Sequence, residues 1–185
     1  MRIISGKLKG RKLHPPKDDR IRPTSDRTRE SLFNLLMHGE LGGNCIIDQP
    51  VLDLCCGTGA LGFEALSRGA SMVCFVDSHG ESIKLAEKNA DSMGVRAECR
   101  FYERSVTALP DFRQAFSLVL MDAPYNTGLI KPALEQLIKV NALQPAAIIA
   151  LEHAGENFTY SESHFEQIDE RKYGKARVTL LRSLV

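Results

Sequence analysis

From position 51 onward, short apolar runs alternate with segments in which apolar residues recur at helical spacing. The runs at 51–54, 72–76, 97–102, 116–121 and 146–151 predict buried strands, and the segments at 59–67, 81–93, 108–114 and 129–140 predict the helices between them. The segments at 165–171 and 176–184, on either side of Tyr173-Gly174-Lys175, are typical of a closing hairpin. This alternation predicts a doubly wound α/β fold with a mostly parallel sheet and an antiparallel edge.

The first 40 residues follow a different pattern. Basic and apolar residues at 2–5 and 11–14, around the glycine-containing segment 6–10, predict a small hairpin. After a proline-rich break, the segment 22–26 supplies a helix N-cap ahead of leucines at helical spacing. We therefore expect residues 1–40 to form a hairpin and a helix, and residues 41–185 to form the α/β domain.

Charge is distributed unevenly between these two parts. The net charge is +1, but residues 1–29 hold ten Lys and Arg against three acids, a local charge of +7 that leaves −6 for the rest. A basic arm on a mildly acidic body is typical of nucleic-acid binding, although a merely solvated terminus is the alternative. Arg27 and Arg29 fall in the first turn of the expected helix, where the helix dipole disfavours cations, and this placement favours contact with a polyanion.

Other function classes find little support in the composition. Cys55 and Cys56 are adjacent, the other three cysteines are single, and the five histidines are scattered, so we expect reduced thiols and no metal site. Apolar runs stay far below the ~20 residues that a membrane span requires, and the N-terminus is too soon interrupted by lysines for a signal peptide. The expected location is the cytoplasm, without a membrane partner.

A glycine loop follows the first strand of the α/β part. Gly57, Gly59 and Gly62 match the pattern G-x-G-x-x-G, and Asp77 ends the next strand, where a carboxylate can accept ribose hydroxyls. Taken alone, this pattern also fits a nicotinamide-dependent oxidoreductase. Asp53 favours S-adenosylmethionine instead, because a carboxylate beside the loop would repel a pyrophosphate and attract the cationic amino-acid end of that cofactor.

The segment Asp122-Ala123-Pro124-Tyr125 follows the fourth apolar run and carries the expected chemistry. Open α/β sheets bind ligands at the carboxyl ends of their strands. The segment sets a carboxylate, a rigid backbone carbonyl and an aromatic ring side by side, and this set has a ready role in methyl transfer.

In these residues the chain resembles the RsmD-type bacterial methyltransferases that modify guanine N2 in 16S ribosomal RNA. The resemblance extends nearly end to end and is most specific in the segment 22–34 combined with the Asp122 motif. It also covers segments 2–13, 51–70 and 173–175 and Glu152. The chain departs from the family at Ala123, where the family has proline, and at Arg104-Ser105. The resemblance implies that Asp122 and the Ala123 carbonyl accept hydrogen bonds from an exocyclic amine and that Tyr125 stacks on a flipped base. Pro124 still holds Ala123 extended, so we expect the carbonyl to keep that role. A carboxylate accepts from both N1–H and the N2 amine of guanine, which favours guanine over adenine without excluding adenine.

The resemblance implies a class I S-adenosylmethionine-dependent methyltransferase with a Rossmann-like fold. The expected catalytic residues are Asp122, Ala123, Pro124 and Tyr125. The expected cofactor contacts are Asp53, Cys55, Gly57, Thr58, Gly59, Asp77, Ser78, Ser105 and Asp122. The expected RNA contacts are Lys7, Lys9, Arg11, Lys12, Arg22, Arg27, Arg29, Lys172 and Lys175.

We accordingly expect a monomer that methylates guanine N2 in 16S ribosomal RNA, within an assembled or assembling small ribosomal subunit. Three alternatives remain open at this stage. They are an adenine-N6 methyltransferase on DNA or RNA, a non-catalytic RNA-binding assembly factor and, more distantly, the nicotinamide-dependent oxidoreductase.

Overall fold

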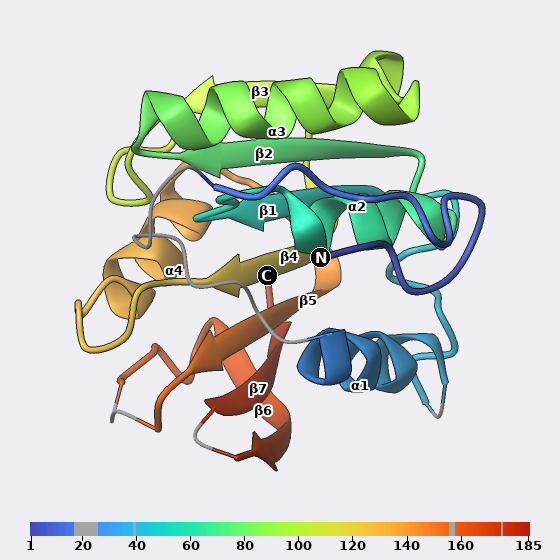
Figure 1. Ribbon diagram of the computed structural model, residues 1–185. Helices are drawn as coiled ribbons and strands as arrows, with labels where there is room; N and C mark the ends of the chain where they lie inside the picture. Colours follow the sequence, from blue (N-terminus) through green and yellow to red (C-terminus); the bar gives the residue numbers. More distant parts are fainter. Residues whose placement is uncertain (17–25, 39, 156–157, 175) are drawn as a thin grey trace.

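The computed structural model describes residues 1–16, 26–38, 40–155, 158–174 and 176–185. Within these residues one seven-stranded sheet forms the centre of the molecule (Figure 1). The strands are β1 (Pro50–Leu54), β2 (Met72–Asp77), β3 (Cys99–Glu103), β4 (Phe116–Asp122), β5 (Leu143–His153), β6 (Phe165–Tyr173) and β7 (Ala176–Ser183). Their order is β3-β2-β1-β4-β5-β7-β6.

The first five strands are parallel, and β7 pairs antiparallel with both β5 and β6. The predicted parallel sheet with an antiparallel edge is therefore confirmed. The order reverses between β1 and β4, and this is the switch point at which such sheets bind ligands.

Helices cover the two faces of the sheet unequally. The helices are α1 (Asp26–Met37), α2 (Ala60–Ser67), α3 (Gly80–Met93) and α4 (Ile130–Lys139), with a short 3₁₀ turn at Arg96–Glu98. Helices α1, α2 and α3 share one hydrophobic cluster with side chains from one face of the strands, whereas α4 packs in a second cluster on the opposite face. Figure 1 shows the N-terminal arm crossing the side on which α2 lies.

The expected helix at 108–114 is wrong. The described chain at 104–115 forms turns and bends, although Val106, Leu109 and Phe112 are buried against the α4 side of the sheet. Two local features oppose a helix: Asp111 accepts the backbone N–H of Arg113 at 2.8 Å, and Arg113 has a φ of 55°. The apolar spacing that resembled a helix therefore reflects the packing of an irregular segment.

The N-terminal hairpin is present in its pairing but not as two strands. A single antiparallel bridge joins Arg2 to Lys12, and Ile3 and Gly10 extend the pairing through backbone hydrogen bonds. Ile3, Leu8 and Leu13 are buried in the same cluster as α1, α2 and α3. The arm therefore packs into the core of the α/β part, and a domain boundary near residue 40 stays a prediction.

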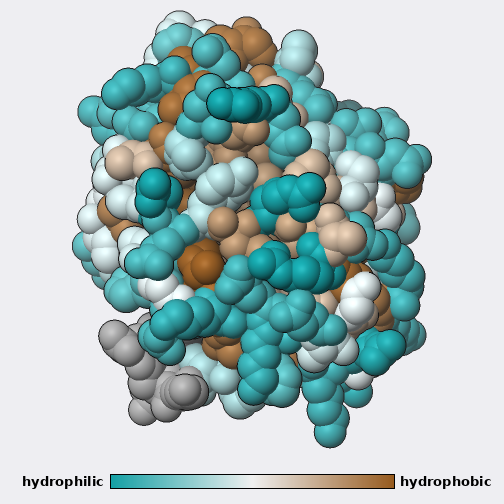
Figure 2. Space-filling model, turned by 90° about the horizontal axis from the view of Figure 1, so that it is seen from above, coloured by the Kyte–Doolittle hydropathy of each residue, from teal (hydrophilic) through white to brown (hydrophobic). Residues whose placement is uncertain are grey.

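The surface over α3 and β3 is mainly hydrophilic, with small separated apolar spots (Figure 2). In the part of the chain that is described, no helix combines the length and the apolar character needed to cross a membrane.

Candidate active site

Four acidic side chains gather at the carboxyl edge of the parallel strands. Asp77 ends β2, Asp122 ends β4, and Asp53 and Glu152 are the penultimate residues of β1 and β5. The register places Asp53 level with Leu120, and Asp122 level with Glu152 on the next strand. Because alternate residues of a strand share a face, all four carboxylates project to the face that carries α2.

Asp53 is held under the glycine loop. Its Oδ2 accepts the backbone N–H of Gly62 at 2.9 Å, and the residue is 1% exposed. Burial raises the pKa of the Asp53 carboxyl well above its usual value; the Gly62 hydrogen bond opposes this shift, and the charges of Asp122 and Asp77 add to it. A cation at this edge would be attracted by all three carboxylates.

The glycines of the loop allow the chain to turn where side chains already fill the space. Gly59 has a φ of +80°, and a Cβ there would meet Phe63 at 2.5 Å. At Gly62 a Cβ would meet Phe75 at 2.4 Å. The backbone of the loop can therefore lie directly against a ligand on one side and the aromatic core on the other.

Asp77 connects the loop to the tip of β2. Its Oδ2 accepts the backbone N–H of Gly57 at 3.0 Å, and its Oδ1 accepts the backbone N–H of His79 at 2.9 Å. A carboxylate has about four acceptor positions, so these bonds are compatible with further hydrogen bonds from ribose hydroxyls. Ser78 is exposed beside it, with Oγ 3.1 Å from His79 Nδ1.

Cys55 lies between the Asp77 and Asp122 strand tips and has a φ of 56°. Burial, together with the charges of Asp77, Asp53 and Asp122, raises the pKa of its thiol to about 12. Cys55 is therefore a neutral, half-buried thiol at the centre of the acidic edge. Within the described residues no group of His, Cys, Asp and Glu side chains is arranged to hold a metal ion.

Ser105 lies in the turn after β3, where its Oγ accepts the backbone N–H of Thr107 at 3.2 Å. The preceding residue, Arg104, donates its backbone N–H to the carbonyl of Asp77 at 2.9 Å. This bond keeps the Ser105 turn beside the tip of β2. The position is compatible with the expected adenine end of a cofactor, and the contact itself stays a prediction.

The Asp122 motif leaves β4 at the centre of this edge. Asp122 is half-buried, Ala123 is buried in the cluster that contains α4, and Pro124 is exposed. Tyr125 is half-buried and donates its hydroxyl to Glu152 Oε1 at 3.1 Å. The structure thus brings Asp122 and Tyr125 together beside Glu152, a residue to which the sequence interpretation gave no role.

Comparisons with known proteins show the family to which this chain belongs. The family described as "Conserved hypothetical protein 95" matches residues 1–182. The ribosomal RNA small subunit methyltransferase D of Haemophilus influenzae is 35% identical over 156 residues, covering 82% of this chain and 78% of that protein. Its Escherichia coli K12 counterpart is 32% identical over 157 residues, covering 85% and 76%. The chain belongs to the RsmD family.

Two solved structures match the chain over nearly its whole length. The Escherichia coli protein yhhF superposes with a TM-score of 0.83 at 29% identity, covering 99% of this chain and 97% of that one. The Haemophilus influenzae protein HI0767 superposes with a TM-score of 0.79 at 30% identity, covering 100% and 98%. The fold is that of class I S-adenosylmethionine-dependent methyltransferases, as the sequence predicts.

Most of the expected RNA contacts of this RsmD chain are exposed where they are described. The exposed residues are Lys7, Lys9, Arg11, Lys12, Arg27 and Lys172. Arg22 and Lys175 lie outside the described residues. The hairpin tip is not beside the acidic edge, because Lys7 donates its backbone N–H to the carbonyl of Ser67 at the far end of α2.

Arg29 is a correction. It is 0% exposed, and its guanidinium donates to the carbonyl of Arg2 at 2.7 Å and to Asp26 at 2.9 Å. Its Nε lies 3.9 Å from Glu64 Oε2. The expectation of a phosphate contact is therefore wrong for Arg29: the face of α1 that carries it turns inward, and buried acceptors and a carboxylate compensate its charge.

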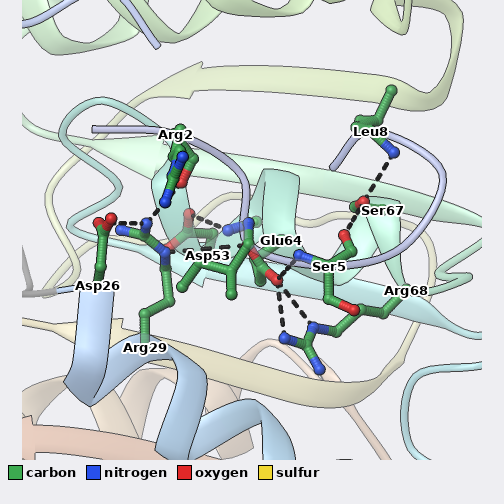
Figure 3. A network of polar contacts seen from close by, with 11 residues as sticks. Arg2, Ser5, Leu8, Asp26, Arg29, Asp53, Glu64, Ser67 and Arg68 are labelled. Atoms are coloured by element: carbon green, nitrogen blue, oxygen red, sulfur yellow. Dashed lines mark hydrogen bonds and ion pairs between the residues drawn. The ribbon is translucent and has the colours of Figure 1, made fainter. Parts of the chain in front are cut away.

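Sequence reasoning missed the residues that bind the arm to the α/β part. The buried Glu64 carboxylate accepts the backbone N–H groups of Ile4 at 2.8 Å and Ser5 at 3.1 Å, and Arg68 Nε donates to it at 2.9 Å. Figure 3 shows Glu64 between the arm and the guanidinium groups of Arg29 and Arg68. One signal was available: a Glu within an otherwise apolar helical segment, 60–66, requires compensation if the helix is buried.

Proposed function

We propose that this chain is an S-adenosylmethionine-dependent methyltransferase that modifies the exocyclic N2 amine of a guanine in 16S ribosomal RNA. The observation that carries the proposal is the placement of Asp122, at the switch point of the sheet, next to the acidic edge formed by Asp53 and Asp77. Membership of the RsmD family and the names of its relatives support ribosomal RNA as the substrate.

The residues at the edge fit S-adenosylmethionine. The buried Asp53 carboxylate suits a cationic ammonium group, and the Asp77 carboxylate suits ribose hydroxyls. A Cβ at Gly59 or Gly62 would collide with aromatic side chains of the core, so the tight course of the loop beside this edge depends on glycine at both positions. When bound, the cofactor supplies an electrophilic methyl group on a sulfonium.

The amine of guanine is a weak nucleophile because its lone pair is delocalised into the ring. Asp122 and the Ala123 carbonyl accept hydrogen bonds from the two N–H groups of the amine, which localises the lone pair on nitrogen and stabilises the positive charge that develops there until the methylated amine loses one proton. Alignment of that nitrogen with the methyl group accelerates the transfer. Effective molarities of about 10⁵ M or more are reached in well-oriented systems. Tyr125 stacks on the base once it is flipped out.

The exposed cations of the arm and of α1 supply affinity for the RNA backbone. A cavity of about 280 Å³ between the arm and the start of α1 includes Arg2, Lys9 and Arg27 in its lining, together with Asp26 and Glu30. Lys172 lies at the same edge of the sheet as Asp122. It is level with Arg177 on β7, and Arg177 is level with His153 at the end of β5. Phosphate contacts over this surface would make binding strongly salt-dependent.

The deciding experiment incubates labelled S-adenosylmethionine and the protein with small ribosomal subunits that lack the modification, followed by nucleoside digestion and mass analysis. We expect N2-methylguanosine. N6-methyladenosine would identify an adenine-modifying enzyme, and RNA binding without any methylated product would identify an assembly factor. Naked 16S RNA is tested as a second substrate, to distinguish an enzyme that requires the assembled subunit from one that acts on the RNA alone.

The Asp122→Ala variant tests the mechanism in the same assay. We expect it to lose methyl transfer while binding of S-adenosylmethionine remains measurable, though weakened by the loss of one edge carboxylate, and undiminished turnover would exclude the proposed role. A thermal-shift comparison tests the cofactor independently, since only a ligand that binds the folded state raises the melting temperature. Stabilisation by NAD instead of S-adenosylmethionine would support an oxidoreductase. Sedimentation of the free protein tests the proposed monomer.

A further inference from the structure

Glu152 is an acidic residue at the end of an apolar strand. The residues before it, Ile148 to Leu151, are buried in the two hydrophobic clusters, and Glu152 itself is 8% exposed. Removing a carboxylate from water is costly, and an apolar residue of similar volume often stabilises such a site as well or better. Stability of the sheet therefore does not account for a carboxylate at this position.

The register gives Glu152 a defined neighbour. It lies level with Asp122 on the adjacent parallel strand, with both side chains on the face that carries α2. The chain leaves β4 after Asp122. Tyr125 follows three residues later, and its hydroxyl donates a hydrogen bond to Glu152 Oε1 at 3.1 Å. This hydrogen bond joins Tyr125 to β5. It spans the point at which the target amine is proposed to lie.

The loop that carries Tyr125 projects from the edge of the sheet. Pro124, Asn126, Thr127 and Gly128 are exposed. Thr127 Oγ1 donates to the carbonyl of Pro124 at 2.7 Å, a bond within the loop, whereas the bond from Tyr125 to Glu152 joins the loop to the rigid sheet. The bond to Glu152 therefore restricts the two side-chain torsions that orient the aromatic ring.

We propose that Glu152 is a positioning residue that fixes the ring of Tyr125 for stacking on the flipped base beside Asp122. This inference rests on the proposed methyl transfer to a base. Glu152 acts through the Tyr125 hydroxyl and requires an acceptor oxygen, not a negative charge. Because the ring is oriented before the base arrives, part of the ordering cost is removed from the binding step.

The test is a double-variant cycle on single-turnover methylation of small ribosomal subunits at saturating S-adenosylmethionine. Tyr125→Phe removes the hydroxyl and keeps the ring, and Glu152→Ala removes the acceptor. We expect each to slow methylation by up to about tenfold, the upper end of the effect of one lost hydrogen bond. The combined variant should be no slower than the slower single one, because both remove the same interaction.

Glu152→Gln supplies the matched control. Its side-chain amide oxygen can accept from the Tyr125 hydroxyl, so we expect recovery of most of the rate lost in Glu152→Ala. The affinity for S-adenosylmethionine should change by less than about twofold in all variants, since the effect is confined to base positioning. If Glu152→Ala lowers stability, the methylation rates of Tyr125→Phe and Glu152→Gln still test the proposal.

Three results would overturn the proposal: a wild-type rate in Tyr125→Phe, a Glu152→Gln variant as slow as Glu152→Ala, or multiplicative effects in the combined variant. The second would assign the effect to the charge of Glu152, and the third to two separate roles. Failure of the proposed function looks different, because the wild-type protein would then yield no methylated guanosine on any ribosomal substrate.

Discussion

Asn89 Oδ1 accepts the backbone N–H of His14 at 2.8 Å, while the Nδ2 of the same side chain donates to the carbonyl of Thr58 at 2.9 Å. Asn89 is 0% exposed, so both bonds are shielded from water. One buried amide on α3 therefore connects the end of the N-terminal arm to the glycine loop. The RNA-binding arm and the cofactor loop that we propose share this single anchor.

We expect Asn89→Ala to lower the free energy of unfolding by about 2 kcal/mol, because a buried donor and a buried acceptor both lose their partner. The melting temperature should fall by roughly 4–8 °C for a chain of this size. The amide of His14 should exchange faster with solvent, and the affinity for S-adenosylmethionine should fall. Lys88→Ala, at the preceding and exposed position of α3, is the control and should remain within about 0.5 kcal/mol.

Arg27 and Arg29 form a matched pair on α1, one exposed and one fully buried. Arg29→Ala should destabilise the protein by about 3–5 kcal/mol, since Glu64 and the carbonyl of Arg2 lose a buried partner. Arg27→Ala should leave stability within about 0.5 kcal/mol but weaken RNA binding and reduce its salt dependence by about one phosphate contact. Urea unfolding and filter binding at several salt concentrations measure the two effects. Equal loss of stability in both variants would contradict the assignment.

The raised pKa of Asp53 predicts a dependence on pH. A carboxyl whose pKa is higher in the folded than in the unfolded state stabilises the fold at pH values below its unfolded-state pKa, about 3.9. This contribution is lost as the pH rises through the folded-state pKa. The stability of the wild type relative to Asp53→Asn should therefore decline as pH rises above about 4. Urea unfolding across a pH series without cofactor measures this difference, and a flat difference would exclude the shift.

Cofactor binding should respond to the same group with the opposite sign. A cationic ammonium favours the ionised Asp53, so the affinity for S-adenosylmethionine should rise with pH through the folded pKa, and binding should release protons. Titration calorimetry in buffers of different ionisation enthalpy detects that release. The Asp53→Asn variant should bind more weakly and show no such pH dependence from this position.

Gly59 and Gly94 both have positive φ, at +80° and +74°, but only Gly59 is crowded. A Cβ at Gly94 would meet nothing within 4 Å, so Gly94→Ala should cost only the backbone strain of about 1 kcal/mol. Gly59→Ala should cost about 1–3 kcal/mol more, because the new Cβ overlaps the Phe63 ring at 2.5 Å. Thermal unfolding gives the comparison, and only Gly59→Ala should weaken the binding of S-adenosylmethionine. Similar losses in both would indicate that crowding is relieved by movement of Phe63.

Local pattern was sufficient for much of the fold and for the candidate edge. Asp77 and Asp122 each end a short apolar run, Asp53 lies one residue before the end of another, and parallel strands necessarily bring such ends to one side of the sheet. The glycine loop is equally local, because its tight turn depends on residues only a few positions apart. The sheet, its antiparallel edge and the position of the Asp122 motif could therefore be predicted from the chain alone.

The partners of Arg29, Glu64, Asn89 and Glu152 could not. Asn89 and His14 are 75 residues apart, and Glu64 and Ile4 are 60 apart, separations at which sequence spacing carries no contact signal. Arg29 shows the consequence. Its position in the first turn of α1, where the helix dipole disfavours a cation, suggested contact with an external polyanion. Instead, Glu64 on another helix compensates its charge in the protein interior. Which polar residue faces water and which is buried depends on how distant segments pack, because burial of a charge becomes affordable only where a partner from elsewhere in the chain arrives.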